Sequence, residues 1–323
     1  MFNVDSPLRS LSSYDMHLLR SLSELSRFKR PLSLALGVFD GVHLGHQTVI
    51  REAVWQARSL KGDAAILTFH PHPAKVLRPE SAPRLLTTEQ QDYELFSALD
   101  ADLCVILDFT KELGMCRPLD FLDEIRKAAP SLRVMVVGPD WHFGHGRTGN
   151  FKLLKAWAGQ HKIHAIEVSP SRVDGEIVSS TMIRNQITEG NLVAANQRLG
   201  RPYQIVGRVV SGDGFGAEIG FPTANLDPES EVIPARGVYA ARALLEGGVF
   251  AAAVNIGVRP TVARTEEVRV EAHLLDFDAD LYGFHMRLDF VSRIREERKF
   301  RTVENLKNQI TADTKIARRA AHE

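Results

Sequence analysis

The first half of the chain alternates short, continuous apolar runs with segments of helical periodicity. The apolar runs predict strands at residues 32–37, 64–69, 102–109, 132–138 and 163–168. Amphipathic stretches lie between them, for example at 118–129, where Pro118 suits a first helical turn, and at 150–162. Strands that are apolar throughout and are separated by helices are typical of a parallel sheet covered on both faces. The fold class predicted for this half is therefore α/β.

The second half has a different period. Residues 179–203 predict a helix that is capped by Ser179 or Ser180 and ends at Glu189-Gly190, followed by a second short helix. Longer segments with period two follow, at residues 203–212, 237–257, 268–278 and 283–294. Gly247-Gly248 interrupts one of them as a hairpin turn. We expect an antiparallel sheet or small β-barrel, closed by a C-terminal helix at 302–320.

The change of period defines the predicted domain limits. They are an N-terminal extension at 1–30, an α/β domain at 31–185, a linker helix region at 186–202 and a β-barrel domain at 203–323. Two domains suit 323 residues, because single cores rarely grow past about 250–300 residues. The start of the extension, through residue 21, is interpreted as a short helix with polar flanks. It is expected to pack on the first strand or to form an oligomer contact.

Composition sets limits on the class of partner. The chain has 40 basic and 40 acidic residues, so no general attraction to nucleic acid or to an anionic membrane is expected. No apolar run approaches the roughly 18 residues of a membrane span, and the N-terminus lacks the apolar segment of a signal peptide. Cys104 and Cys116 predict reduced thiols in a cytoplasmic protein. An oligomer is compatible with all of these features.

The stretch GVFDGVHLGHQ at 37–47 contains the first candidate chemistry. It joins a strand to a helix, where backbone N–H groups and the positive end of the helix dipole attract anions. His43 and His46 fit three readings: polar filling of a tight turn, a metal pair on one helical face, or donors of hydrogen bonds to a phosphate. No third metal ligand is evident nearby. Neither a P-loop nor a GxGxxG fingerprint is present.

Two more polar segments begin where predicted strands end. They are TFHPHP at 68–73 and GPDWHFGHGRTGN at 138–150. Because ligands of parallel sheets bind beyond the carboxyl ends of the strands, the three segments together predict one site. The prolines of TFHPHP favour a rigid loop over a metal site, so His70 and His72 are expected in structural or substrate-proximal roles.

Together these motifs resemble those of the prokaryotic bifunctional riboflavin kinase/FAD synthetases, from about residue 31 to residue 317. In the first half, GVFDGVHLGH, TFHPHP, GPDWHFGHGRTGN and SSTMIR (179–184) match an HxGH nucleotidyltransferase. In the second half, GFPTANL (220–226), GVYA (237–240), NIGVRPT (255–261) and VEAHLLDFDADLYG (270–283) match a riboflavin kinase. The resemblance implies a Rossmann-like FMN adenylyltransferase domain followed by a kinase barrel with a terminal helix.

The implied reactions use ATP as co-substrate and Mg²⁺ as cofactor. Riboflavin is phosphorylated to FMN with release of ADP, and FMN is then adenylylated to FAD with release of pyrophosphate. By the resemblance, His43 and His46 hydrogen-bond the triphosphate, and Glu271 is the general base of the kinase. The implied nucleotide- and phosphate-binding residues are Gly37, Phe39, Asp40, Gly41, Gly45, Asp140, Ser180, Thr181, Arg184 and Gly220. The implied Mg²⁺ ligands are Thr223 and Asn225, and the flavin-binding candidates are Phe143, Arg147 and Asn150.

Without the resemblance, purely structural roles also explain several of these residues. SSTMIR could cap a helix, Asp140 could be a turn residue, and Glu271 could lie on the solvent-facing side of a strand. Two other functions are a different HxGH transferase, such as a cytidylyltransferase, and a flavin-binding protein whose kinase site has decayed. The loop GDGFGAEIG (212–220) departs from the family, which commonly carries Arg or Lys at the places of Phe215 or Ala217. Glu218 adds negative charge, so we expect weakened binding of ATP by the kinase.

Overall fold

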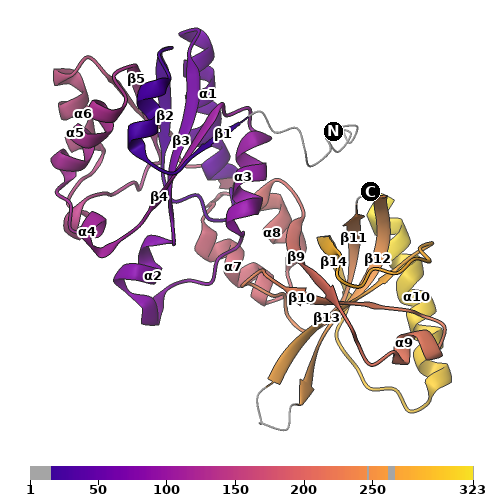
Figure 1. The fold of residues 1–323 in the computed structure, drawn as a ribbon. Helices are drawn as coiled ribbons and strands as arrows, with labels where there is room; N and C mark the ends of the chain where they lie inside the picture. The colour runs from indigo at the N-terminus through magenta and orange to yellow at the C-terminus, as the bar shows by residue number, and fades with distance from the viewer. Residues whose placement is uncertain (1–15, 246, 261–265, 323) are drawn as a thin grey trace. The chain divides into compact units, whose positions relative to one another are not determined.

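The structure is a computed structural model and describes residues 16–245, 247–260 and 266–322 (Figure 1). The chain forms two compact units. The first unit ends at Arg172, except that the short stretch Arg84–Thr88 belongs to the second unit, which continues from Val173. The domain limits predicted from the sequence, at 31–185, 186–202 and 203–323, stay a prediction.

In the described part of the first unit, six strands form one sheet with the order β1-β4-β3-β2-β5-β6, and every pair in it is parallel. The strands are β1 (His17–Leu19), β2 (Leu32–Leu36), β3 (Asp63–His70), β4 (Leu103–Asp108), β5 (Leu132–Val137) and β6 (His164–Glu167). The strands from β2 to β6 confirm the predicted α/β class. All residues of β2 are buried, as expected for a strand covered on both faces.

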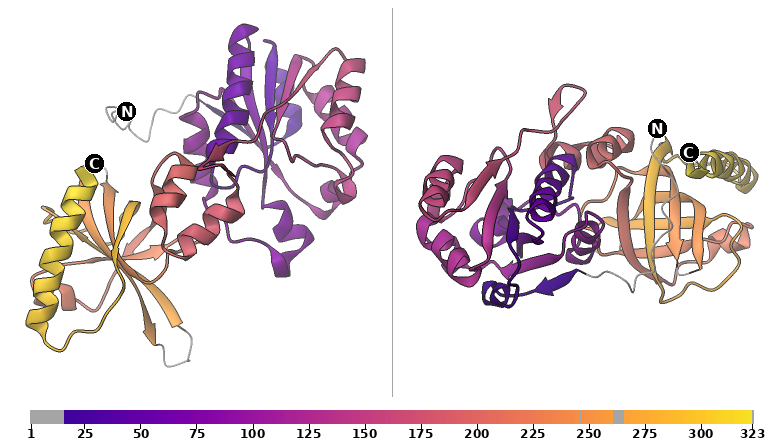
Figure 2. Two further views of the ribbon diagram at one scale, coloured as in Figure 1. Left: turned by 180° about the vertical axis from the view of Figure 1, so that it is seen from behind. Right: turned by 90° about the horizontal axis from the view of Figure 1, so that it is seen from above.

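Helices cover both faces of this sheet (Figures 1 and 2). One core cluster joins Leu34 of β2 to α5 (Pro118–Ala128) and α6 (Phe151–Gln160). The other cluster joins Ala35, the next residue of the same strand, to α1 (Leu44–Ser59) and α3 (Glu89–Ser97). The shorter helical segments of this unit are η1 (Leu22–Arg27), α2 (Pro73–Leu77), η2 (Pro79–Ser81), α4 (Lys111–Gly114) and η3 (His145–Arg147).

The edge strand β1 corrects the prediction for the N-terminal extension. Residues 17–19, which were predicted to be helical, pair in parallel with β4. The 3-10 helix η1 follows and buries Leu25 completely, at 0% exposure. A three-residue strand is too short to show a period, so the sequence pattern could not reveal it. Residues 1–15 of the predicted helix lie outside the described residues.

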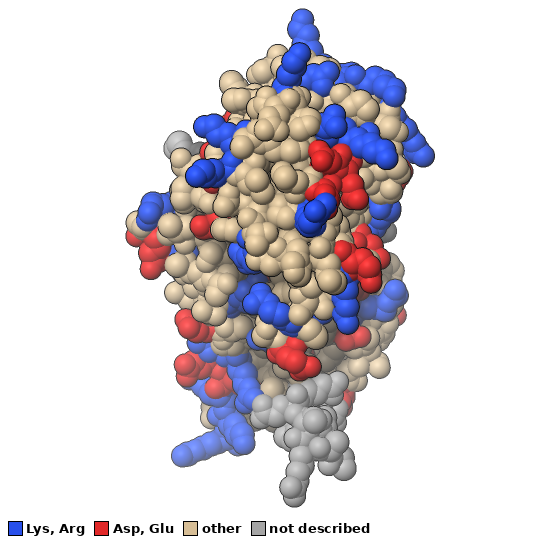
Figure 3. All heavy atoms as spheres, turned by 90° about the vertical axis from the view of Figure 1, so that its left-hand side faces the viewer, with Lys and Arg blue, Asp and Glu red and all other residues tan. Residues whose placement is uncertain are grey.

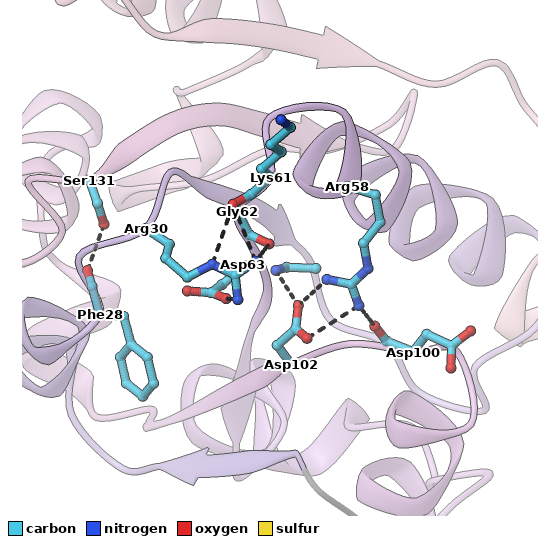
Figure 4. A network of polar contacts seen from close by, with 10 residues as sticks. Phe28, Arg30, Arg58, Lys61, Gly62, Asp63, Asp100, Asp102 and Ser131 are labelled. Atoms are coloured by element: carbon cyan, nitrogen blue, oxygen red, sulfur yellow. Dashed lines mark hydrogen bonds and ion pairs between the residues drawn. The ribbon is translucent and has the colours of Figure 1, made fainter.

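Charged side chains form hydrogen bonds and ion pairs at the amino ends of the parallel strands (Figure 4). Arg58 of α1 donates to both carboxylate oxygens of Asp102, at 2.6 and 3.2 Å, and Asp102 also accepts the N–H of Ala64 at 2.7 Å. Arg30 pairs with Asp63 at 2.8 Å. These contacts lie at the amino ends of the strands. The polar motifs, in contrast, follow the carboxyl ends of the strands.

The described strands of the second unit include a closed six-stranded antiparallel barrel, with the order β10-β13-β12-β11-β14-β9. The strands are β9 (Tyr203–Val210), β10 (Ala224–Pro228), β11 (Gly237–Leu245), β12 (Gly248–Pro260), β13 (Glu266–Leu274) and β14 (His285–Arg295). The predicted β-barrel is confirmed, and β11 and β12 meet at the predicted hairpin, where Leu245 pairs with Gly248. Along β13, Val270 and Ala272 point into the core, so residues between them face outward.

Helices flank the barrel as expected. The helix α7 (Ser180–Thr188) is followed by α8 (Leu192–Leu199), and Gly190, with φ of 81°, stands between them at the predicted stop. The terminal helix α10 (Val303–His322) lies along the outside of the barrel, where Ala317 packs on Ala240 and Ala253 (Figure 2). The remaining short elements are α9 (Phe215–Glu218) and the two-stranded ribbon of β7 (Arg172–Val173) and β8 (Glu176–Ile177).

Basic and acidic side chains are mixed on the face drawn in Figure 3, which suits a chain with a formal net charge of zero. Within residues 16–245, 247–260 and 266–322, no helix has the length and apolar character needed to cross a membrane.

The two thiols are expected to differ in reactivity. Cys104 lies in β4 with 0% exposure, and burial raises the pKa of its thiol to about 12. Cys116 is partly exposed. Because the thiolate is the reactive species, iodoacetamide should label Cys116 in the folded protein and Cys104 only after denaturation. Mass spectrometry of the labelled peptides measures this difference, and rapid labelling of Cys104 in the native protein would contradict it.

Candidate active sites

The segment GVFDGVHLGH connects the end of β2 to the start of α1. His43 is the N-cap of the helix, and its Nδ1 accepts the backbone N–H of His46 at 3.3 Å. Since Nδ1 accepts, a neutral His43 has its ring proton on Nε2. The residue is only 6% exposed. The cap therefore fixes both the tautomer and the direction of a hydrogen-bond donor at a helix N-terminus.

The two imidazoles of this segment lie against each other. The rings of His43 and His46 are stacked with centroids 3.6 Å apart and an interplanar angle of 19°. His46 also meets the ring of Phe39 edge-on at 5.4 Å. Phe39 is buried, and a Cβ on Gly37 would lie 2.8 Å from its ring. Phe39 thus supports the histidine pair from the core, and Gly37 leaves room for its ring.

The other predicted residues of this turn shape its backbone. Asp40 is 7% exposed, and Gly41 has φ of 82°, a left-handed conformation that suits glycine. The side chain of Gln47 donates to the carbonyl oxygen of Val42 at 3.0 Å, which fastens the turn to α1. Gly45 is half-buried in the first turn of α1. These contacts hold the turn in one conformation, so the start of α1 can present its backbone N–H groups to an anion.

The segment GPDWHFGHGRTGN follows β5, the sheet neighbour of β2. Asp140 is exposed. Phe143, predicted as a wall of the flavin pocket, is 7% exposed and belongs to the core, where it stacks on Trp141 at 4.2 Å. Arg147 is exposed, and Asn150 caps α6 by accepting the N–H of Leu153 at 3.0 Å. Trp141, whose ring stacks on Phe143, was not among the candidates predicted from the sequence.

The histidines of TFHPHP have different surroundings. His72 caps α2, because its Nδ1 accepts the N–H of Ala74 at 3.1 Å. His70 lies 3.5 Å from Glu89, which also pairs with Arg20. The Arg20 guanidinium lowers the pKa of the Glu89 carboxyl below its usual range. Among the described residues, no three His, Cys, Asp or Glu side chains gather as a metal-binding set.

The motif SSTMIR belongs to the second unit, whereas His43 and His46 belong to the first. The cap of α7 is Ser179, whose Oγ accepts the N–H of Met182 at 3.3 Å. Ser180 and Thr181 are therefore the first residues of the helix. Arg184, one turn further on, donates from Nε to the carbonyl oxygen of Arg84 at 2.7 Å.

The kinase candidates meet on the outer face of the barrel. Asn225 of β10 and Asn255 of β12 are the cross-strand neighbours of Glu271 in β13. Their side chains lie on the same side of the sheet, since directly paired residues of neighbouring strands share a face. Glu271 is partly exposed, with 27% of its side chain accessible. The register thus brings a predicted Mg²⁺ ligand next to the predicted base.

A glycine-bearing loop at 211–220 packs directly on this row of residues. A Cβ on Gly212 would lie 2.0 Å from Nδ2 of Asn225, so a side chain at position 212 would displace the Asn225 amide. A Cβ on Gly216 would lie 3.2 Å from Oγ1 of Thr223. Gly220, with φ of 86°, ends the loop. His273 donates from Nδ1 to the carbonyl oxygen of Pro222 at 2.7 Å, which ties the PTAN segment to β13.

A cavity in the second unit was not anticipated from the sequence. It has a volume of about 460 Å³ and lies between the end of β14 and the start of α10. Its lining contains three cations, three amides and one aromatic ring: Arg298, Lys299, Phe300, Arg301, Asn305, Asn308 and Gln309. Glu297, just before it, lies beside Gly257 near Asn255. The basic run RKFR was the signal in the sequence that could have pointed to this cavity.

Comparisons with known proteins agree with both halves of this description. The family model described as FAD synthetase matches residues 25–182, and the model described as riboflavin kinase matches residues 199–321. A bifunctional riboflavin kinase/FMN adenylyltransferase of Pseudomonas fluorescens is 35% identical over 308 residues, which is 95% of this chain and 98% of that protein. Its counterpart from Haemophilus influenzae is 34% identical over 305 residues, 94% of this chain and 98% of that protein.

A solved structure shares the fold over the same extent. The crystal structure described as a macrolide-efflux protein from Streptococcus pneumoniae has a TM-score of 0.83 and 29% sequence identity, and the match covers 94% of this chain and 98% of that chain. The chain belongs to the family of bifunctional riboflavin kinase/FMN adenylyltransferases. The predicted family, fold class and pair of activities are confirmed, and the FAD synthetase match over residues 25–182 favours FMN adenylylation over a cytidylyltransferase activity.

Proposed function

We propose that Glu271 is the general base of riboflavin phosphorylation. The proton of the ribityl 5′-hydroxyl passes to the carboxylate as the oxygen forms a bond to the γ-phosphorus of ATP, and ADP leaves. The observation that carries this proposal is the register of Asn225, Glu271 and Asn255 on the outer face of the barrel. A positioned base supplies about 10²–10⁴-fold in rate, and Glu271 has access to solvent and hence to a substrate.

The neighbouring oxygens suit a hard cation. Mg²⁺ prefers few protein oxygens together with phosphate and water. The hydroxyl of Thr223 and the amide oxygen of Asn225 provide such donors, and the loop at 211–220 packs against both side chains. These two residues would hold Mg²⁺, which when bound supplies charge stabilisation to the phosphates. Gly220, at the end of the loop, would then lie beside the nucleotide.

The cavity at the start of α10 is proposed to receive the flavin of the kinase reaction. Its volume of about 460 Å³ is within the range of small-molecule sites, about 300–1,000 Å³. Phe300 provides an aromatic ring, and the amides of Asn305, Asn308 and Gln309 suit the polar edge of an isoalloxazine. Glu297 connects this cavity to the neighbourhood of Asn255, and so to Glu271.

The adenylyltransferase reaction is proposed for the HxGH segment. There a phosphate oxygen of FMN attacks the α-phosphorus of ATP, and pyrophosphate leaves. His43 and His46 are proposed to donate to the triphosphate, next to the backbone of Gly37, Phe39, Asp40, Gly41 and Gly45. In the same unit, Asp140 is proposed to lie near the nucleotide and Phe143, Arg147 and Asn150 near the flavin. Ser180, Thr181 and Arg184 of the second unit are proposed, from the family resemblance alone, as phosphate-binding residues. Two free thiols suit a reducing compartment, so we place both reactions in the cytoplasm.

Chromatography of the products tests the proposal. Incubation of the full-length protein with riboflavin, ATP and Mg²⁺ should give FMN first and FAD afterwards. Omission of Mg²⁺, with a chelator present, should stop both products. A folded protein that binds riboflavin but forms no FMN would instead be a flavin-binding protein with a decayed kinase site.

A further inference from the structure

We propose that Arg269 binds the phosphates of ATP in the kinase site and so supplies the cation that the loop at 211–220 lacks. This inference rests on the proposed kinase function. The loop sequence SGDGFGAEIG contains two carboxylates, on Asp213 and Glu218, and no Lys or Arg. The two carboxylates of this loop repel a triphosphate, and apart from the proposed Mg²⁺ the loop itself offers no cation to offset that charge.

Arg269 is placed to act as that cation. It stands two residues before Glu271 on β13, and the alternation of the strand puts both side chains on the outer face. Its Nη1 lies 2.9 Å from Oδ2 of Asp213 and 3.5 Å from Oε1 of Glu271. A single guanidinium nitrogen thus lies between the loop and the proposed base.

The position of the base limits where the γ-phosphate can be. The attacking hydroxyl must be within hydrogen-bond reach of Glu271, and the γ-phosphorus must be in contact with that hydroxyl. Nη1 of Arg269 lies 3.5 Å from the same carboxylate, so it lies close to the position of the transferred γ-phosphate. Arginine suits this role, because its planar set of donors matches phosphate oxygens and stays charged at every physiological pH.

Asp213, one of the partners of Arg269, can be displaced. The side chain of Asp213 is 52% exposed, and an ion pair with access to solvent contributes little to stability. A triphosphate carries more charge than one carboxylate and can accept several hydrogen bonds. On this account ATP takes the place of Asp213 beside Arg269.

The alternative is a tether, in which Arg269 only holds the loop through Asp213. The two accounts differ in what a change at Asp213 does. If Arg269 is a tether, loss of either Arg269 or Asp213 should impair ATP binding. Loss of a competing carboxylate should leave ATP binding intact or improve it.

The experiment measures riboflavin phosphorylation against ATP concentration for Arg269→Met, Arg269→Lys and Asp213→Asn. We expect Arg269→Met to raise the KM for ATP by about 10-fold to 100-fold with kcat much less affected, since a charge-assisted contact present throughout binding is lost. Arg269→Lys should raise KM less, because it keeps the charge but loses the planar donor set. Asp213→Asn should keep or lower the KM.

Arg318→Met is the matched control. Arg318 pairs with Asp276 in the same unit, so this variant also loses one guanidinium and one arginine–aspartate pair. Its KM for ATP should equal that of the wild type. Circular dichroism and thermal unfolding of the full-length protein report whether each variant is folded. If Arg269→Met is not folded, the KM of Arg269→Lys is the deciding measurement.

An unchanged KM in the folded Arg269 variants, or an Asp213→Asn variant as impaired as Arg269→Met, would overturn the inference. A wild-type protein that forms no FMN would instead refute the proposed kinase function.

Discussion

Glu271→Gln should lower the rate of riboflavin phosphorylation by about 10²–10⁴-fold and leave the adenylylation of supplied FMN close to the wild-type rate. The amide keeps the size and polarity of the side chain but has no basic carboxylate to accept the hydroxyl proton. The register next to Asn225 and Asn255 should be retained, because Glu271 faces outward and its substitution creates no core cavity. The rate of FMN formation, measured by chromatography, is the readout.

Two controls make this result specific. Glu229→Gln changes an exposed glutamate of the same unit, which contacts His285, and should leave both reactions intact. FMN must be supplied for the second reaction, because otherwise a kinase lesion removes its substrate and imitates a double loss. If Glu271→Gln phosphorylates riboflavin at the wild-type rate, Glu271 is not the base.

His46→Ala should have the opposite effect. We expect the adenylylation of FMN to fall by about 10²–10³-fold, by analogy with the loss of one donor from an oxyanion site, while FMN is still formed from riboflavin. The loss should appear in kcat, since negative charge on the triphosphate grows in the transition state. Release of pyrophosphate from ATP and FMN measures this reaction directly.

The histidine pair requires its own control for packing. His46 stacks on His43 and contacts Phe39, so a local rearrangement could imitate the loss of a donor. His161 is a matched histidine of the same unit that stacks on Trp157 at 4.7 Å, and His161→Ala should leave adenylylation unchanged. His46→Gln retains a donor and should recover part of the rate. If His46→Ala abolishes both reactions in a folded protein, separate sites for the two activities are untenable.

Features of the chain that depend on neighbouring residues alone could be predicted from the sequence. The strands β2 to β5 were found because residues buried on both faces form continuous apolar runs. The end of α7 was found because Glu189-Gly190 is a local stop signal, and the hairpin at Gly247-Gly248 was found for a similar reason. The motifs themselves led to the correct family, since their order along the chain is specific.

Features that depend on a distant partner could not be predicted. The edge strand β1 exists because β4 offers it an open edge of backbone groups, whereas its own three residues show no period. The resemblance made Phe143 a flavin-binding candidate, and only the tertiary structure places its ring in the core of the first unit.

What the sequence by itself determined is therefore the order and kind of elements, the two halves and the family. Only the tertiary structure decided that Asn225 and Asn255 flank Glu271, and that Arg269 lies between Glu271 and Asp213. The physical reason is that register and loop packing join residues tens of positions apart. Such contacts arise when strands far apart in the sequence pair in one register, and the alternation within a single strand selects a face but not the residue that lies opposite.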